Sequence, residues 1–406
     1  MHILFLSDNF PPEGNAPATR TYEHAKEWVK LGHKVTIITG APNFPEGKVF
    51  PGYRNGWYLK EYMDGIEVRR VKTYISANEG FLKRIADFLS FMFMSFFAGL
   101  FVSRPDVIVG TSPQFFTVCG AWALSVVRRR PFVFELRDIW PASITAVGAM
   151  KHSGVIKFLE RLEMFLYRRA DRIVSVTNAF KDELIRRGVS ENKIGVVLNG
   201  VDLSVYGPAS GKDKELAKSY GLENKFVIGY VGTHGLAHAL DKVLDAAEIL
   251  KGHDEICFLF AGGGAVKEDL DNDIRRRGLT SVVSVQRQPK SMMSRLWSLC
   301  DVSLISLRDT PLFSTVIPSK IFESMGCGLP MIVSAPAGEA TDIVGRAGAG
   351  IVIDPEDPVA LATAVICLYE NDGLRASMAQ SSYEHAGEFD RASLARALIK
   401  ELDLVV

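Results

Sequence analysis

Residues 226–238 read FVIGYVGTHGLAH, an apolar run that ends in a turn of small residues. A short β-branched and aromatic run bounded by glycine predicts a buried strand at 226–231, and a helical pattern follows it. Small residues at such a turn let the backbone approach a ligand, because the N-terminus of the next helix attracts anions. The stretch therefore predicts one strand-turn-helix unit of a parallel α/β domain.

The same alternation of short apolar runs and longer helical patterns covers the chain and predicts an α/β fold with parallel sheets. So many strands do not suit one compact sheet, but they suit two doubly wound Rossmann-like domains. We expect strands near residues 2–6, 34–39, 67–72, 106–110, 131–135, 173–177 and 194–198, and then near 226–231, 256–260, 282–286, 302–306, 330–334 and 350–353.

A polar stretch rich in turn-forming residues, at 200–224, marks the break between the two halves. We place one domain at 1–203 and the other at 204–383, with a helix at about 384–406 that packs back onto the first. Ligands of open α/β sheets bind at the carboxyl ends of the strands. Two such domains in tandem therefore predict a central cleft that both sheets face.

The composition excludes some classes of function. The 406 residues include 47 acidic and 47 basic ones, so a broad surface for nucleic acid is not expected. The five cysteines are far apart and mostly lie in apolar runs, which indicates buried thiols in a reducing cytoplasm. The first residues lack the basic region of a signal peptide.

Two loops after predicted strands are candidates for binding phosphate groups. The loop at 8–16 is not a G-x-G-x-x-G fingerprint, which argues against a nicotinamide dehydrogenase. Gly14 and Asn15 can both adopt positive φ and turn backbone N–H groups toward a ligand. In the second loop Gly232, Thr233 and His234 precede a helix. Ordinary strand-to-helix turns remain the alternative for both loops.

The segment at 317–330, IPSKIFESMGCGLP, is the most informative loop. Pro318 fits the first position of a helix, and Lys320 and Glu323 share one face of it. A lysine in the first turn opposes the helix dipole, which indicates that an anion is expected nearby. Lysine can neutralise a diphosphate, and a carboxylate can accept both hydroxyls of a ribose. A solvated ion pair is the alternative.

A fourth loop, ELRDIWP at 135–141, follows another predicted strand. Asp138 beside Trp140 resembles a sugar site, in which a carboxylate binds hydroxyls and an indole covers the apolar face of the ring. The alternative is that Arg137 and Asp138 form a pair that caps a helix.

Taken together, the order and spacing of these loops resemble glycosyltransferase family 4, which has the two-domain GT-B architecture. The resemblance is to transferases of the O-antigen and colanic acid type, such as the N-acetyl-L-fucosamine transferase. The segments that carry it are FPPEG at 10–14, LGHKVTI at 31–37, VLNGVD at 197–202, GGG at 262–264 and PSKIFE at 318–323.

The resemblance implies a retaining, metal-independent glycosyltransferase of lipopolysaccharide, O-antigen or capsule synthesis. Its donor is a nucleotide-sugar, UDP-linked, with an N-acetylated amino sugar as one candidate, and its acceptor is a polyprenyl-diphosphate-linked sugar. No cofactor and no nucleic-acid partner are implied. The resemblance assigns catalysis to Asp138 and Lys320, and donor binding to Glu323, Gly14, Asn15, Gly232, Thr233, His234, Gln286, Gln288, Ser319, Gly338 and Glu339.

Two positions depart from the family pattern. Thr315 stands where the family often has a glutamate, eight residues before Glu323, and His238-Ala239 stands where many members have Lys-Gly. There is also no convincing D-x-D pair, because Asp269 and Asp271 lie in a charged helical segment. A sugar-nucleotide 2-epimerase of the same architecture and a non-catalytic subunit of glycan assembly therefore remain alternatives.

The segment at 85–102 is apolar apart from Asp87. Its length just reaches that of a membrane-spanning helix, but a span would divide one sheet between two sides of a bilayer. A buried crossover helix is a second interpretation. We favour a third, in which one face packs on the sheet and the other enters the membrane interface. This predicts a cytoplasmic protein attached peripherally to the inner face of the plasma membrane.

Overall fold

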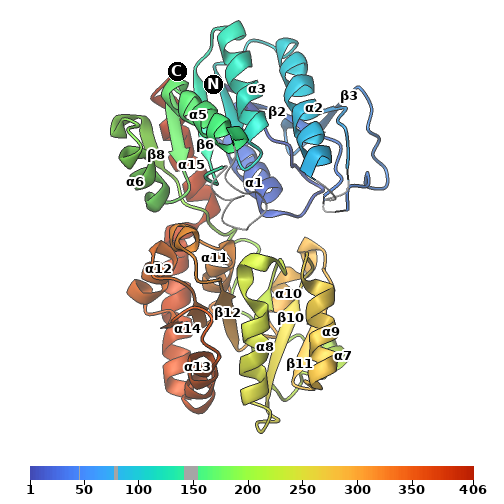
Figure 1. Cartoon of the computed structure of the whole chain (residues 1–406), viewed down its shortest axis with the longest axis vertical. Coiled ribbons are helices and arrows are strands. Elements are labelled where there is room, and N and C mark those ends of the chain that lie inside the picture. The colour runs from blue at the N-terminus through green and yellow to red at the C-terminus, as the bar shows by residue number, and fades with distance from the viewer. Residues whose placement is uncertain (45, 77–80, 141–153) are drawn as a thin grey trace. The chain divides into compact units, whose positions relative to one another are not determined.

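The computed structural model describes residues 1–44, 46–76, 81–140 and 154–406. The chain forms two compact units, and each contains one sheet. Unit 1 comprises Met1–Leu198 and the returning segment Arg391–Val406, whereas unit 2 comprises Asn199–Asp390 (Figure 1). Two sheets rich in parallel strands agree with the prediction of two Rossmann-like domains.

Unit 1 contains a sheet with the strand order β3-β4-β2-β1-β5-β6-β7-β8. Its central strands are buried, as in parallel sheets that helices cover on both faces. All neighbouring strands are parallel except the pair of β3 and β4. The strands are β1 His2–Leu6, β2 Lys34–Gly40, β3 Tyr58–Met63, β4 Ile66–Val71, β5 Val107–Thr111, β6 Phe132–Leu136, β7 Arg172–Ser175 and β8 Ile194–Val196.

The antiparallel edge strand β3 is absent from the sequence prediction. Its residues, YLKEYM, are mostly exposed and include two charged side chains. Edge strands often carry charges, which hinder pairing with other chains, and they lack the continuous apolar run of a buried strand. The seven strands predicted for this unit all occur, with ends within two residues of those expected.

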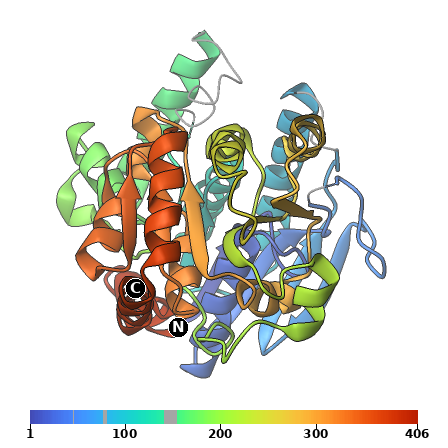
Figure 2. The ribbon, with the colours of Figure 1, turned by 90° about the horizontal axis from the view of Figure 1, so that it is seen from below.

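The helices of unit 1 form two groups. Helices α2, α3 and α5 pack in sequence, whereas α1 packs against the C-terminal helix α15. The Trp28 indole donates a hydrogen bond to the carbonyl of Ala395 at 2.9 Å, which ties α15 to α1. The chain termini, Met1 and Val406, lie close together (Figures 1 and 2). The helices are α1 Ala16–Lys30, α2 Phe81–Leu100, α3 Phe115–Arg128, α5 Gly154–Arg169, α6 Asn178–Arg186 and α15 Arg391–Asp403.

Unit 2 contains an all-parallel sheet with the order β11-β10-β9-β12-β13-β14. Its strands are β9 Phe226–Val231, β10 Ile256–Ala261, β11 Val282–Val285, β12 Val302–Ser306, β13 Met331–Ser334 and β14 Gly350–Ile353. Its helices are α7 Lys214–Tyr220, α8 Leu240–Ile249, α9 Lys267–Arg277, α10 Met293–Trp297, α11 Ser319–Gly326, α12 Glu339–Ala347, α13 Pro358–Glu370 and α14 Asp372–Ala386.

The chain leaves unit 1 after Leu198 and returns at Arg391, whereas the sequence placed these points near 203 and 384. The difference has a local cause. The amide of Val201 donates to the carbonyl of Phe389 at 3.0 Å, and Val201 forms a parallel bridge with Asp390. Because these two segments pair with each other, the turn-rich residues after 200 lie inside unit 2.

Helix α2 holds the apolar segment that the sequence singled out. Phe91 and Ser95 are buried, whereas Phe93 and Phe97 are more than half exposed. No helix within the described residues is both long enough and apolar enough to cross a bilayer. Helix α2 has one buried and one exposed apolar face.

Candidate functional site

The candidate donor-binding residues of unit 2 follow the carboxyl ends of its parallel strands. This is the edge at which open α/β sheets bind ligands. Gly232, Thr233 and His234 follow β9, and Gln286 and Gln288 follow β11. Ser319, Lys320 and Glu323 lie on α11, which comes after β12. Gly338 directly precedes α12, and Glu339 begins it, after β13.

The loop after β9 lies tightly against the loop after β10. The amide of His234 donates to the carbonyl of Gly263 at 3.0 Å. A Cβ at Gly262 would lie only 1.8 Å from the carbonyl oxygen of Gly232, and Gly262 has a φ of +154°. Only glycine fits both the space and the backbone conformation here. The two loops, at 232–234 and 262–264, thus pack together beside α11 and form the floor of the candidate site.

Lys320 lies on α11, next to this floor, and is the charged group of the candidate site with the most distinctive surroundings. The side chain is only 8% exposed, and its Nζ lies 3.4 Å from the centre of the Tyr230 ring. Within the described residues Nζ has no hydrogen-bond partner. Burial lowers the lysine pKa to about 7, and the nearby Glu323 offsets this only in part. A buried lysine whose Nζ has no hydrogen-bond partner among the described residues is a favourable place for an anion.

Two histidines adjoin this lysine. His234 is fully buried, and neither ring nitrogen has a hydrogen-bond partner among the described residues. Burial, together with the charges of Lys267 and Lys320, lowers the pKa of His234 to about 4, and burial with the charge of Lys320 lowers that of His238 to about 3. Both imidazoles are therefore neutral at pH 7. His238 does not replace the cation that the family often carries at this position, so Lys320 supplies the positive charge.

Glu323 lies one turn after Lys320 on α11. Its Oε2 accepts a hydrogen bond from the indole of Trp297 at 3.3 Å, and this contact fixes the carboxylate. Pro318 does not occupy the first helical position that the sequence predicted. It precedes the helix with a ψ of 129°, and α11 begins at Ser319. Thr315 ends a short 3-10 helix, where its hydroxyl donates to the carbonyl of Leu312.

The remaining candidates of unit 2 lie in the adjacent loops. Gly338 abuts the segment before α11, because a Cβ there would lie 2.0 Å from the carbonyl oxygen of Ser314. Glu339 is the first residue of α12. Gln286 is exposed, and its carbonyl accepts a hydrogen bond from the Gln288 side chain at 3.1 Å.

In unit 1 the prediction for Gly14 and Asn15 is wrong in its geometry. Asn15 has a φ of −83°, and its side chain caps α1 by accepting from the amide of Ala18 at 2.9 Å. Gly14 is not among the glycines with positive φ. The Asn15 oxygen satisfies an amide of the first helical turn. The loop is thus closed by a helix cap, and its backbone does not form the predicted positive-φ turn.

Asp138 lies beyond the carboxyl end of β6, where its amide contacts the hydroxyl of Ser112 at 3.2 Å. The Arg137 guanidinium donates to the carbonyls of Ala16 and Pro17 at the start of α1, both at 3.3 Å. The helix that Arg137 and Asp138 would cap in the alternative interpretation falls on residues 141–153, outside the described residues. The indole of Trp140 stacks on Phe115 with ring centres 4.8 Å apart, so one of its faces is covered.

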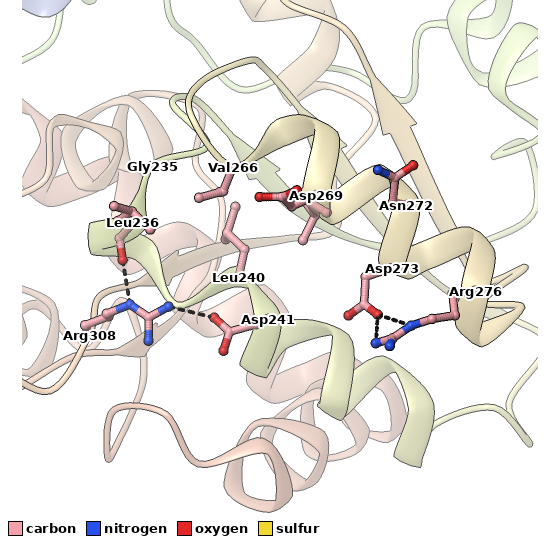
Figure 3. A pocket seen from close by; sticks show the side chains of 11 residues that line it. Gly235, Leu236, Leu240, Asp241, Val266, Asp269, Asn272, Asp273, Arg276 and Arg308 are labelled. Atoms are coloured by element: carbon pink, nitrogen blue, oxygen red, sulfur yellow. Dashed lines mark hydrogen bonds and ion pairs between the residues drawn. The ribbon is translucent and has the colours of Figure 1, made fainter. Parts of the chain in front are cut away.

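A cavity of about 480 Å³ lies between α8 and α9 of unit 2 (Figure 3). Its charged side chains pair mainly with each other. Arg308 binds Asp241 at 3.1 Å and the carbonyl of Leu236 at 2.6 Å, and Arg276 pairs with Asp273. Because both of its arginines are already paired, this cavity offers less to a diphosphate than Lys320 does.

Two family models match consecutive parts of the chain. Glycosyltransferase Family 4 matches residues 17–205, and the model for glycosyl transferases group 1 matches residues 212–385. The chain is a glycosyltransferase, and its first half matches family 4. The first match covers the loop of Asp138, and the second covers the floor around Lys320.

Relatives and solved structures agree with this assignment. The glycosyl transferase WcaI of Escherichia coli strain K12, named for colanic acid biosynthesis, is 24% identical over 90% of this chain and 91% of its own. The glycosyltransferase WbjE of Pseudomonas aeruginosa is 25% identical over 73% and 76%.

Among solved structures, HepE of Anabaena in complex with UDP-glucose has a TM-score of 0.74 at 17% identity and covers 99% of both chains. Sucrose-phosphate synthase of Thermosynechococcus elongatus has a TM-score of 0.79 at 14% identity, with coverage of 99% of this chain and 98% of that one. At this identity the likeness shows the fold, which is the GT-B fold of glycosyltransferases.

Proposed function

We propose that this glycosyltransferase is a retaining, metal-independent enzyme that uses a UDP-linked sugar to extend a lipid-linked glycan of a bacterial surface polysaccharide. The use of a nucleotide-sugar donor is supported by one observation above all: the buried Lys320 ammonium beside Glu323, at the carboxyl edge of the sheet in unit 2. The named role of the relative in colanic acid biosynthesis and the UDP-glucose complex of HepE support the polysaccharide and the nucleotide.

Departure of the nucleoside diphosphate is the difficult step of such a transfer. Lys320 stabilises the charge that grows on the leaving phosphate, and the N-termini of nearby helices add their amide donors. The neutral imidazoles of His234 and His238 add no repulsion. Retention then follows from attack on the face that the diphosphate leaves, with the leaving phosphate accepting the proton of the acceptor hydroxyl.

We expect nucleotide-sugar turnover to survive an excess of chelator. The proposal gives charge neutralisation to Lys320, and Asp271 of the Asp269/Asp271 pair already forms an ion pair with Lys267 at 2.8 Å. The measurement is release of UDP from a panel of UDP-sugars with and without EDTA. Full loss of activity in EDTA that magnesium or manganese restores would contradict metal independence.

We expect Asp138→Asn to leave donor affinity almost unchanged and to lower transfer by about 10²-fold, the usual scale for a group that acts on the reacting centre. Asp138 lies in unit 1, whereas the nucleotide residues lie in unit 2. The measurement compares the Kd of UDP-sugar with the rate of transfer. A normal rate in the folded variant would return Asp138 to a structural role at the end of β6.

The lipid-linked acceptor requires access to a membrane surface, and α2 offers an apolar face for it. Phe93 and Phe97 are 55% and 54% exposed, at a spacing that places them on one side of the helix, and Phe101, directly after the helix, is 80% exposed. Lys83 and Arg84 are exposed at the start of α2. Apolar side chains beside cations are typical of a helix at the interface of an anionic bilayer.

We expect the double variant Phe93→Ser and Phe97→Ser to bind anionic liposomes about tenfold more weakly, because exposed phenyl area no longer leaves water. Flotation with vesicles of anionic phospholipid at low salt measures this. The matched control is Ile249→Ser with Val359→Ser, two exposed apolar residues of unit 2. If the wild type does not float with these vesicles, or if the control loses as much binding, α2 is not the membrane contact.

A further inference from the structure

The Lys320 ammonium lies on the face of a buried aromatic ring. Its Nζ is 3.4 Å from the centre of the Tyr230 ring, well inside the roughly 6 Å range of a cation–π contact. Tyr230 is 1% exposed, and Nζ meets no hydrogen-bond acceptor among the described residues. The ring face thus stands where an acceptor for a buried ammonium would ordinarily lie.

Contacts on its other sides hold the Tyr230 ring in place. The phenol hydroxyl donates to the carbonyl of Thr233 at 2.7 Å, which ties the ring to the loop after β9. The rings of His234, His238 and Phe260 pack around it, with centres 5.6, 5.8 and 6.0 Å away. A ring held on several sides keeps its face toward the lysine.

Tyr230 does not act on the ammonium as an anion. Burial raises the pKa of the phenol well above its usual value, so the hydroxyl stays protonated and the ring uncharged. The negative face of an aromatic ring attracts a cation without a formal charge, and most strongly where water is excluded. This attraction offsets part of the cost of burying the ammonium.

The other groups around Lys320 do not replace this contact. Glu323 on the same helix favours the charged lysine, but its Oε2 is bound to the Trp297 indole. The imidazoles of His234 and His238 are neutral at pH 7 and supply no negative charge. A carboxylate in place of the ring would hold the cation more strongly, but it would also repel the phosphates of a donor. The ring stabilises the cation and leaves its charge available to an anion.

We propose that Tyr230 is a positioning residue for the transfer: the face of its ring holds the Lys320 ammonium in place and favours its charged form, which binds the diphosphate of the donor. The inference rests on the proposed function, in which Lys320 acts on the leaving phosphate, and adds the residue that prepares this lysine. Because the ring is 1% exposed, it acts through Lys320 and not on the substrate.

The test gives residue 230 rings of similar shape and different charge distribution. Tyr230→Phe keeps the negative ring face and removes the hydroxyl, whereas Tyr230→pentafluorophenylalanine removes the negative face, because fluorine withdraws electrons from the ring. NMR of isotopically labelled lysine measures the pKa of Lys320 in the free protein, and Lys320→Met assigns the signal. We expect this pKa to be lower in the pentafluoro variant, by about tenfold in the dissociation constant, and close to the wild-type value in Tyr230→Phe.

UDP binding gives a second readout that a purely structural role would not move. At pH 8, where the lysine has to take up a proton on binding, the pentafluoro variant should bind UDP about tenfold more weakly than Tyr230→Phe does. At pH 6 the difference should be only about twofold. It should vanish in a Lys320→Met background, because the charge on which the ring acts is gone.

The matched control is Phe260→pentafluorophenylalanine, which alters a buried ring beside Tyr230 and should change neither readout. An unchanged lysine pKa in the pentafluoro variant of Tyr230 would overturn the proposal. An equal change in the Phe260 control would do the same, as would a loss of UDP affinity that persists in the Lys320→Met background. Failure of UDP to bind the wild type contradicts the proposed function alone, since the lysine pKa is measured in the free protein.

Discussion

Lys320→Met is expected to lower nucleotide-sugar turnover by about 10²–10³-fold, the loss that follows removal of one preorganised group from a developing negative charge. The lysine Nζ is buried and has no hydrogen-bond partner among the described residues, so no other contact competes for it. Methionine keeps an unbranched apolar side chain and removes the charge that lies over the Tyr230 ring. The measurement is kcat for UDP-sugar turnover. A wild-type kcat in the folded variant means that the diphosphate binds elsewhere.

Stability provides the control for this substitution. Burial lowers the lysine pKa to about 7, so the folded chain binds this proton less tightly than the unfolded chain does. The charged lysine therefore costs stability below pH 7, and this cost disappears as the pH rises toward the unfolded value. Lys320→Met should unfold at a higher temperature than the wild type at pH 6, with a smaller difference at pH 9. Lower stability of the variant at pH 6 would contradict the buried-cation description.

The same pKa predicts that UDP binding takes up a proton. About half of the free protein carries a charged Lys320 at pH 7, and the bound diphosphate favours the charged form. UDP should therefore bind about fivefold more weakly at pH 8 than at pH 7. Lys320→Met removes this dependence. Calorimetry at the two pH values, in buffers of different ionisation enthalpy, measures both the affinity and the proton.

The parallel strands could be predicted because each is buried on both faces and reads as a continuous apolar run, as β9 and β10 do. The edge strand β3 was missed because its side chains face water, although it pairs with the next strand of the chain through a tight turn at Asp64 and Gly65, a dipeptide that favours hairpins. The sequence also could not show that residues 199–203 and 384–390 belong to unit 2. The pairing of Val201 with Asp390 decides this, and it joins residues that are far apart in the chain.

The candidate site was predictable where helical spacing decides which side chains share a face. Lys320 and Glu323 do lie one turn apart on α11. Spacing cannot reveal partners from other elements, such as Tyr230 under the lysine and Trp297 on the carboxylate. The prediction for Asn15 failed for a different reason. A residue type that can adopt positive φ is also a good helix cap, and in the structure Asn15 caps α1.

Glu323→Ala is expected to weaken UDP binding by about 10–100-fold, because two ribose hydroxyls lose a charged acceptor and each such bond contributes about 1.5–3 kcal/mol at most. The effect on kcat should be small, since the ribose contacts are the same in the ground state and the transition state. The control is Glu370→Ala, an exposed carboxylate at the end of α13. Calorimetry with UDP measures the affinity of each protein.

A ligand lacking one ribose hydroxyl gives a second test of the ribose assignment. The wild type should bind UDP more tightly than 2′-deoxy-UDP, whereas Glu323→Ala should bind the two with similar affinity, because contacting groups are coupled in a double-mutant cycle. Trp297 donates to Oε2 of Glu323 at 3.3 Å, so the carboxylate is oriented before the ligand arrives. Equal discrimination between the two nucleotides by wild type and variant would show that Glu323 contacts another part of the donor.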